Sequence, residues 1–217
     1  LRTLVHKIAA TDANVLITGE NGTGKEMIAK EIHAFSERKN EVMICVDMGA
    51  ISETLFESEL FGHVKGAFTD AKEDRTGKFE AANKGTLFLD EIGNLSFALQ
   101  SKLLAALQSR NIIRVGSNKP IATDIRLICA TNSNLQDMVD QGQFREDLLY
   151  RINTIHLEIP PLRERENDIL LLADFFLQKY SQKYHKTGLR LSPETQKQLL
   201  RYPWPGNVRE LQHSIEK

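Results

Sequence analysis

The chain has 217 residues, of which 28 are basic and 29 acidic, and its formal net charge is −1 at pH 7. This length allows one large hydrophobic core, or a main domain with a smaller one attached. Because the charges balance, no overall positive field attracts a nucleic-acid backbone, so we expect DNA contacts to come from another segment or a partner. No apolar run approaches the roughly 20 residues of a membrane-spanning helix, and the N-terminus has no secretory pattern. We therefore expect a cytoplasmic protein without a membrane partner.

Cysteine and histidine usage predicts neither a disulfide nor a zinc site. Cys45 and Cys129 lie in apolar, strand-like runs, which favours reduced thiols in the core. The six histidines are scattered, and no pair has the spacing of zinc ligands. Residues 1–10 begin in one helical pattern and residues 207–217 stop inside another. We expect a domain excised from a longer polypeptide.

The first two-thirds of the chain alternates short apolar runs with helical patterns. Strand-like runs cover residues 15–18, 42–46, 86–90, 125–130 and 152–159, and helical patterns cover 25–36 and 98–109. Strands that alternate with helices indicate crossover connections, and hence a mostly parallel sheet covered on both faces. Residues 111–121 are predicted to form a hairpin with its turn near 116–118.

Pro160 and Pro161 end this alternation, and only helical patterns follow. These patterns cover residues 169–184, 193–201 and 208 onward, the second of them behind a Ser192 cap. The sequence thus predicts an α/β domain over residues 1–159 and a small helical domain over 160–217.

Residues 19–25 fit the phosphate-binding pattern G-x-x-x-x-G-K between a strand and a helix. In that setting, glycines let backbone N–H groups converge on phosphate oxygens, the helix N-terminus adds partial positive charge, and Lys25 reaches the terminal phosphates. The alternative is an ordinary glycine-rich turn. The expected binding residues are Gly19, Glu20, Asn21, Gly22, Thr23, Gly24, Lys25 and Glu26. Glu26 replaces the usual Ser or Thr, so Mg²⁺ must depend on phosphates, water and a carboxylate elsewhere.

The strand-like run 86–90 supplies that carboxylate, because it ends in Asp90 and is followed by Glu91. Ligand-facing groups lie at the carboxyl ends of buried parallel strands. We expect Asp90 to orient the magnesium shell and Glu91 to polarise an attacking water. An acidic first helical turn is the alternative, but the upstream phosphate loop favours catalysis. Thr131 and Asn132 close the next strand and are placed to align water or sense the γ-phosphate.

Residues 144–151 have a helical pattern with Arg145 and Arg151 six positions apart. Arginines stabilise the charge on a transferring phosphoryl group, often from a neighbouring subunit. A solvated helix face is the alternative, and the spacing alone does not exclude it.

Taken together, these motifs resemble the AAA+ domain of bacterial enhancer-binding activators of the sigma-54 form of RNA polymerase. The matching runs are residues 19–26, 59–71, 85–91, 144–151, 160–165 and 204–211. They span nearly the whole chain in order, and the run at 59–71 is specific to this branch. The family also commonly carries Glu after the loop lysine, as at position 26 here.

The resemblance implies a P-loop AAA+ fold with a helical lid, ATP and Mg²⁺ as cofactors, and self-association into a ring, a hexamer or heptamer. It implies the sigma-54 RNA polymerase holoenzyme as partner, with DNA bound only through a C-terminal domain that these residues lack. The loop residues Gly66, Ala67, Phe68, Thr69, Asp70 and Ala71 correspond to the segment that engages the sigma factor, with Phe68 and Thr69 at its tip. Asp70 stands where the family most often has Gly, which adds a negative charge and restricts the backbone.

The resemblance also implies roles for single residues. Asp47 corresponds to a polar switch, more often Asn, that restrains the catalytic Glu until nucleotide is sensed. Arg145 and Arg151 correspond to arginine fingers that act in trans, and Arg209 to a second sensor that contacts nucleotide from the lid. Arg163 and Arg165 lie in a matching run without a catalytic assignment, and a salt-bridged structural role suits them.

Three functional hypotheses follow. The leading one is an ATP-hydrolysing motor domain of a transcriptional activator that remodels the sigma-54 holoenzyme to drive open-complex formation. A second keeps the ATPase but changes its target to another protein or nucleic acid. A third is a regulatory module that binds nucleotide without hydrolysing it, against which Glu91, Thr131 and Arg145 all argue.

Overall fold

The computed structural model describes residues 2–186 and 188–217. It divides into two compact units. The first unit comprises Leu1–Thr18 and Glu26–Leu157, and the second comprises Gly19–Lys25 and Glu158–Lys217. The phosphate loop, residues 19–25, therefore belongs to the same unit as the C-terminal helices. The predicted domain boundary after residue 159 stays a prediction.

A five-stranded sheet forms the centre of the first unit, in the order β2-β5-β8-β1-β9. The strands are β1 (Val15–Thr18), β2 (Met43–Asp47), β5 (Thr86–Asp90), β8 (Arg126–Thr131) and β9 (Ile155–Glu158). β2 with β5, β5 with β8, and β1 with β8 all pair in parallel. The expected parallel sheet is confirmed, and β9 is shorter than the predicted run 152–159 because a helix extends to Ile152.

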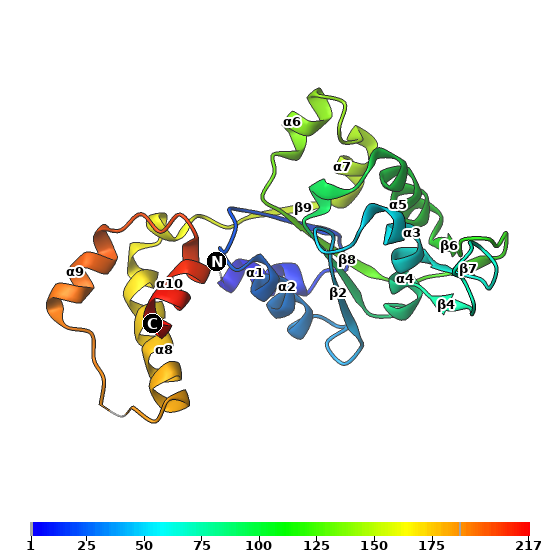
Figure 1. Cartoon of the computed structure of the whole chain (residues 1–217). Helices are drawn as coiled ribbons and strands as arrows, with labels where there is room; N and C mark the ends of the chain where they lie inside the picture. The colour runs from blue at the N-terminus through cyan, green and yellow to red at the C-terminus, as the bar shows by residue number, and fades with distance from the viewer. Residues whose placement is uncertain (1, 187) are drawn as a thin grey trace. The chain divides into compact units, whose positions relative to one another are not determined.

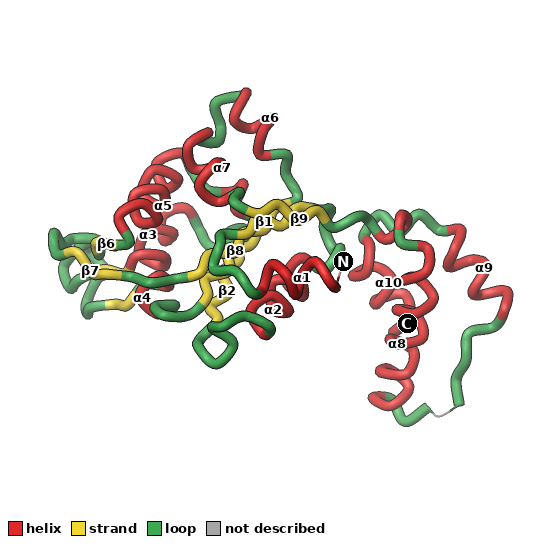
Figure 2. Tube along the Cα trace, turned by 180° about the vertical axis from the view of Figure 1, so that it is seen from behind, coloured by secondary structure: helices red, strands yellow, loops and turns green. Residues whose placement is uncertain are grey.

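Helices cover both faces of this sheet (Figure 1). α1 (Arg2–Ala9) and α2 (Lys25–Ala34) lie on one side, and α3 (Glu53–Phe61), α5 (Phe97–Ser109) and α7 (Glu146–Ile152) lie on the other, as the reverse view in Figure 2 also shows. Leu87, Leu89 and Leu127 are fully buried in the core on the α3–α5–α7 side. Each such side chain contributes about 1.5–3 kcal/mol through burial.

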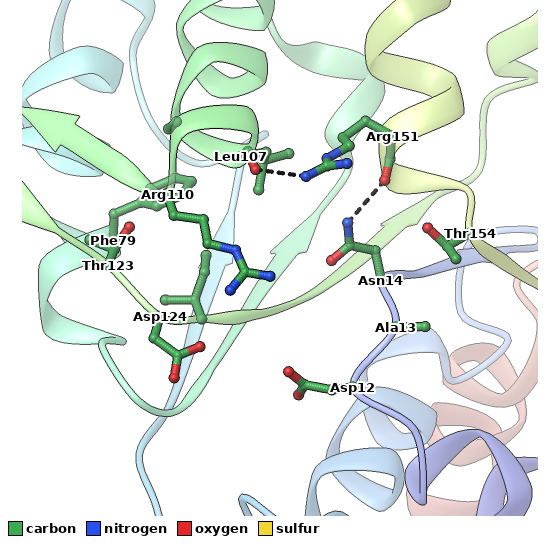
Figure 3. A pocket seen from close by; sticks show the side chains of 12 residues that line it. Asp12, Ala13, Asn14, Phe79, Leu107, Arg110, Thr123, Asp124, Arg151 and Thr154 are labelled. Atoms are coloured by element: carbon green, nitrogen blue, oxygen red, sulfur yellow. Dashed lines mark hydrogen bonds between the residues drawn. The ribbon is translucent and has the colours of Figure 1, made fainter.

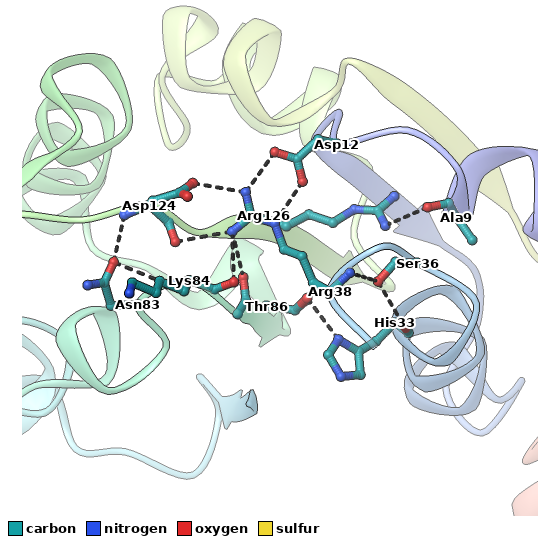
Figure 4. Close-up of polar contacts among 11 residues, drawn as sticks. Ala9, Asp12, His33, Ser36, Arg38, Asn83, Lys84, Thr86, Asp124 and Arg126 are labelled. Atoms are coloured by element: carbon teal, nitrogen blue, oxygen red, sulfur yellow. Dashed lines mark hydrogen bonds and ion pairs between the residues drawn. The ribbon is translucent and has the colours of Figure 1, made fainter. Parts of the chain in front are cut away.

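Two arginines fasten the amino-terminal edge of the sheet (Figure 4). Arg126 is 1% exposed and donates to the last two carbonyls of α1, at 2.8 and 3.1 Å. The Ile8 carbonyl also accepts from the amide and hydroxyl of Thr11, at 3.0 and 2.9 Å, and the positive charge of Arg126 at this end of α1 complements the helix dipole. Arg38 bridges Asp12 and Asp124, at 2.8 and 2.9 Å. The start of the chain is thereby tied to β8.

Shorter elements complete the first unit. The predicted hairpin is confirmed as β6 (Asn111–Ile113) and β7 (Pro120–Ala122). Sequence patterns did not predict the antiparallel pair β3 (Gly62–His63) and β4 (Arg75–Thr76). The remaining elements are α4 (Lys78–Ala81), the 3-10 helix η1 (Ile92–Asn94) and α6 (Leu135–Asp140).

The two cysteines differ in burial. Both are free thiols, as expected, and Cys129 in the central strand β8 is completely buried. The prediction of a core position is wrong for Cys45, which is exposed. Its strand, β2, is at the edge of the sheet, where one side has no neighbouring strand.

The second unit is helical apart from the phosphate loop. It contains the 3-10 helix η2 (Leu162–Glu164), α8 (Glu166–Lys183), α9 (Pro193–Arg201) and α10 (Asn207–Glu216). Its core gathers Leu162, Ile169, Phe176, Trp204 and Leu211. The Ser192 cap is confirmed, since its hydroxyl accepts from the Thr195 amide at 3.1 Å. Within the described ranges, no helix combines the length and apolar character needed to cross a membrane.

Candidate nucleotide site

The carboxyl ends of the sheet strands bring the predicted polar residues to one edge. In the strand register, Asp47 is the partner of Asp90, and Thr131 is the partner of Thr18. Gly19, the first residue of the phosphate loop, directly follows Thr18. The edge where β1 ends therefore carries the acids at the ends of β2 and β5 and the threonine at the end of β8.

Glu91 adopts a left-handed backbone, with φ 55° and ψ 48°. Its amide donates to Oδ1 of Asp90 at 3.0 Å, and the next residue, Ile92, is fully buried. A left-handed conformation costs a non-glycine residue on the order of 1–2 kcal/mol, and such strain gathers at active sites because the surroundings impose it. The local structure thus fixes the backbone from which the proposed catalytic carboxylate projects.

Asp47 and Thr131, at the carboxyl ends of β2 and β8, each accept a hydrogen bond from an amide two residues further along the chain. Asp47 Oδ1 accepts from the Gly49 amide at 2.8 Å. Thr131 is fully buried and its hydroxyl oxygen accepts from the Ser133 amide at 3.1 Å, whereas Asn132 is exposed. The switch role of Asp47 and the water-aligning or sensing roles of Thr131 and Asn132 stay predictions.

The phosphate loop folds around its lysine. Lys25 is 6% exposed, and its Nζ donates to the carbonyl of Gly19 at 3.0 Å. Gly22 and Gly24 have φ of 77° and 101°, values that favour glycine. A side-chain carbon built on Gly24 would meet nothing within 4 Å, so the loop is open there. Backbone N–H groups in such a concave turn suit an anion.

Residues after 158 contact the phosphate loop within the second unit. Arg163 forms a bidentate ion pair with Glu20, at 2.6 and 2.9 Å. This pairing, with a further hydrogen bond from Asn207, lowers the pKa of Glu20 from its ordinary value of 4.5 to about 2. The expected salt-bridged role of Arg163 is confirmed, and its partner belongs to the phosphate loop.

Asn207 is a contact that sequence reasoning missed. It is completely buried, with a positive φ of 53°. Its Nδ2 donates to Glu20 Oε2 and to the Asn21 carbonyl, both at 3.0 Å, while its Oδ1 accepts from the Leu162 amide at 2.7 Å. Asn207 lies in the run 204–211 that matches the family, but the resemblance gave it no role. The local signal is an Asn after a Gly, two residue types that tolerate left-handed backbone.

Two more hydrogen bonds, one from a backbone amide and one from a side chain, join residues after 158 to carbonyls of the loop. The Val208 amide donates to the Gly22 carbonyl at 3.0 Å, and Arg165 Nη2 donates to the Thr23 carbonyl at 3.3 Å. Arg209 is exposed, and its Cβ lies 3.1 Å from the position of a Cβ built on Gly22. The structure thus brings Arg209 beside the loop, while its contact with nucleotide stays a prediction. Glu26 pairs with Lys30 on the exposed face of α2, at 2.7 Å.

The two predicted finger arginines lie at opposite ends of α7. Arg145 directly precedes its first residue, and there Nε and Nη2 donate to Asp147 at 2.9 and 2.7 Å while Nη1 donates to Ser101 at 3.1 Å. Arg151, in the last turn, donates to the Leu107 carbonyl at 3.0 Å (Figure 3). It lines a cavity of about 220 Å³ together with Asn14, which precedes β1. The guanidinium groups therefore occupy different places in this subunit.

The predicted partner loop, residues 66–71, is compact. The Gly66 amide donates to the Ala71 carbonyl at 2.8 Å, and Phe68 is 40% exposed. The Phe68 ring packs edge-on against His63, with 4.9 Å between centroids. Asp70 does not have a positive φ, so its backbone carries no strain that a glycine at this position would relieve.

Residues 62–64, which lead into this loop and form its root, are hydrogen-bonded to Val115 in the turn between β6 and β7. The Val64 amide donates to the Val115 carbonyl at 3.0 Å, and the Val115 amide donates to the Gly62 carbonyl at 2.9 Å. His63 is 8% exposed and shares a 2.7 Å hydrogen bond with the Ser58 hydroxyl. The root is thereby fixed, while the tip around Phe68 keeps part of its apolar surface in solvent.

Comparison with known proteins identifies both parts of the chain. Residues 1–158 match the sigma-54 interaction domain, and residues 163–217 match the AAA+ ATPase lid domain. The chain is 53% identical to the regulatory protein AtoC of Escherichia coli K12, over 97% of this chain and 46% of AtoC. It is 50% identical to the sigma54-dependent transcriptional regulator SfnR of Pseudomonas fluorescens, over 97% of this chain and 58% of SfnR. The chain thus spans about half the length of the curated relatives it matches.

Solved structures show the same fold. The crystal structure of NtrX from Brucella abortus in complex with ADP superposes with a TM-score of 0.92 at 33% identity, covering 99% of this chain and 47% of NtrX. NtrX in complex with ATP gives a TM-score of 0.91, also at 33% identity, over 99% of this chain and 49% of NtrX. Hsp104 shares the fold alone, at 21% identity and a TM-score of 0.69. The chain therefore belongs to the sigma-54 interaction family of AAA+ ATPase domains.

Proposed function

We propose that this chain is the ATP-hydrolysing motor of a transcriptional activator that remodels the sigma-54 RNA polymerase holoenzyme. The observation that carries the proposal is the strand register, which aligns Asp47 with Asp90 and Thr131 with Thr18 at the edge where the phosphate loop begins. Binding of ADP and ATP by NtrX, and the sigma-54-dependent relatives, support the same conclusion.

The loop residues suit a nucleoside triphosphate. Open space at Gly24 leaves room for phosphate oxygens against the backbone amides, and Lys25 at the start of α2 supplies a cation. Its Nζ now donates to Gly19 and Glu20 carbonyls. On binding, those bonds give way to stronger charge-assisted bonds with phosphate.

The acids at the sheet edge supply the hydrolytic chemistry. Among the described residues, no cluster of three or more histidine, cysteine or carboxylate side chains would by itself hold a metal ion. Mg²⁺ would accordingly rest on phosphate oxygens and water beside Asp90, and when bound it neutralises phosphate charge. Glu91 accepts a proton from the attacking water, and general-base catalysis of this kind contributes about 10²–10⁴-fold.

Arg145 completes the site from an adjacent subunit. Its guanidinium is held by Asp147 and Ser101 at the start of α7, preorganised for an external phosphoryl group. The side chain is about one-third exposed, at 31%. Hydrolysis in this scheme requires assembly into a ring, and it rises more steeply than protein concentration until assembly is complete.

A mixing experiment tests the shared site. Glu91→Gln and Arg145→Ala are each expected to be inactive alone. Mixed in equal amounts, they restore about a quarter of the wild-type sites if subunits associate at random. The Arg145→Ala subunit keeps Glu91 and the Glu91→Gln subunit keeps Arg145, and about one interface in four brings the two intact residues together in the required order. Phosphate release by the mixture that equals the average of the two separate variants would show that Arg145 does not act across subunits.

The partner loop carries the motor output. Phe68 presents apolar surface at the tip of residues 66–71, above a root fastened to the hairpin. An exposed aromatic side chain in such a setting is a usual anchor of protein interfaces. Phe68→Ala is expected to abolish sigma-54 binding while sparing ATP hydrolysis. Loss of hydrolysis in parallel would instead assign Phe68 to the fold of the motor.

A further inference from the structure

The buried amide of Asn207 is the meeting point of three segments. It lies at the start of α10, and its two polar atoms contact the phosphate loop and the amide of Leu162 in η2. It is 0% exposed and has left-handed backbone, which costs a non-glycine residue about 1 kcal/mol. A buried, fully bonded amide in a strained backbone is retained for the bonds that it makes.

These bonds hold the phosphate loop at Glu20, Asn21 and Gly22. Asn207 Nδ2 holds the Asn21 carbonyl and a Glu20 oxygen, and Arg163 holds both oxygens of Glu20. The next residue along α10, Val208, holds the Gly22 carbonyl. The carbonyls of Asn21 and Gly22 are thus both held by groups at the start of α10.

We propose that Asn207 is a positioning residue for nucleotide binding, which preorganises the phosphate loop from the lid through Glu20 and Asn21. The inference rests on the proposed nucleotide site and names a determinant of its affinity. A preorganised loop does not lose conformational freedom when phosphate binds, so weakening the Asn207 contacts lowers affinity more than it slows chemistry.

The test is calorimetric titration with Mg²⁺ and ADP. Asn207→Asp places a carboxylate oxygen against the Glu20 carboxylate and the Asn21 carbonyl, replacing a donor by an acceptor. The expected weakening is about tenfold to a hundredfold in Kd. Steady-state hydrolysis should show the rise in KM for ATP, with a smaller change in kcat. Asn40→Asp, in an exposed turn, makes the same charge change away from the loop and should leave Kd unchanged.

A second substitution restores the pairing with its polarity reversed. In the double variant Asn207→Asp with Glu20→Gln, the glutamine amide donates to the new carboxylate, and ADP should bind several-fold more tightly than to Asn207→Asp alone. A role limited to stability would shift the melting temperature without this rescue of affinity.

The outcomes separate the two proposals. No ADP binding by the wild-type chain would refute the nucleotide site itself. Wild-type binding that Asn207→Asp leaves unchanged, or a double variant no tighter than the single one, would overturn the positioning role. Should Asn207→Asp not fold, Glu20→Gln serves alone, because its side chain is 43% exposed and outside the core. It should weaken ADP binding about threefold, and unchanged binding would contradict the inference.

Discussion

Gly22→Ala tests the packing of the lid segment on the phosphate loop. Gly22 has φ of 77°, and a Cβ built there would lie 2.4 Å from the Gly206 carbonyl oxygen and 3.1 Å from the Arg209 Cβ. Ordinary contact for a Cβ begins at 3.4 Å, so the loop and the segment must separate by about 1 Å. No flexible side-chain end is available to absorb this shift at the backbone carbonyl.

The cost has two parts. The left-handed backbone costs alanine about 1–2 kcal/mol relative to glycine. Separation also breaks the 3.0 Å bonds from Val208 to the Gly22 carbonyl and from Asn207 to the Asn21 carbonyl. At about 1 kcal/mol per hydrogen bond, the free energy of unfolding should fall by about 3–4 kcal/mol in total.

A matched control isolates the contact. Gly188, in the same unit, has φ of 80°, and a Cβ there would meet nothing within 4 Å. Gly188→Ala should therefore carry only the backbone cost of about 1–2 kcal/mol. Urea unfolding without nucleotide is read from the fluorescence of Trp204, the single tryptophan, which is 3% exposed in the core of the second unit. Equal losses in the two variants would refute the packing of Gly22 against the lid segment.

Three further outcomes are expected. Glu91→Gln should lower hydrolysis by about 10²–10⁴-fold while leaving ADP affinity unchanged in titration calorimetry; retained turnover would remove Glu91 from its role. Arg163 lowers the pKa of Glu20 from 4.5 to about 2 in the folded state. The ion pair of these two residues therefore stabilises the folded state fully above pH 4.5, and this contribution is lost as pH falls toward 2. Glu20→Gln should accordingly show a smaller acid-induced loss of stability, followed by Trp204 fluorescence, and an unchanged acid profile would contradict this. A thiol reagent should modify exposed Cys45 quickly and buried Cys129, whose thiol pKa is raised by burial, only on unfolding; two fast thiols would count against the burial of β8.

Local patterns predicted the parallel sheet, and the carboxyl ends of parallel strands meet at one edge, which accounts for the positions of Asp90 and Thr131. Asp47 was expected from the family resemblance alone, and its pairing with Asp90 depends on the strand order, which the local patterns do not give. The phosphate loop was readable because its glycines, its lysine and the flanking elements lie within one short stretch.

Contacts between segments far apart in the chain could not be predicted from the sequence. Asn207 and Glu20 are 187 residues apart, and no periodicity connects them. The sequence also did not reveal that β2 is the outermost strand of the sheet, because the apolar run around Cys45 resembles that of a central strand. The separation of Arg145 from Arg151 did have a signal, since six residues at 3.6 per turn place two side chains on different faces of a helix.

The most direct test of the motor proposal is binding of labelled sigma-54, followed by fluorescence anisotropy across nucleotide states. With ADP and aluminium fluoride, which mimic the transition state of hydrolysis, the wild-type chain should bind sigma-54, and Phe68→Ala should not. With ADP alone, neither should bind. Binding that is independent of nucleotide, or that survives Phe68→Ala, would contradict the account, as would the absence of binding in every nucleotide state.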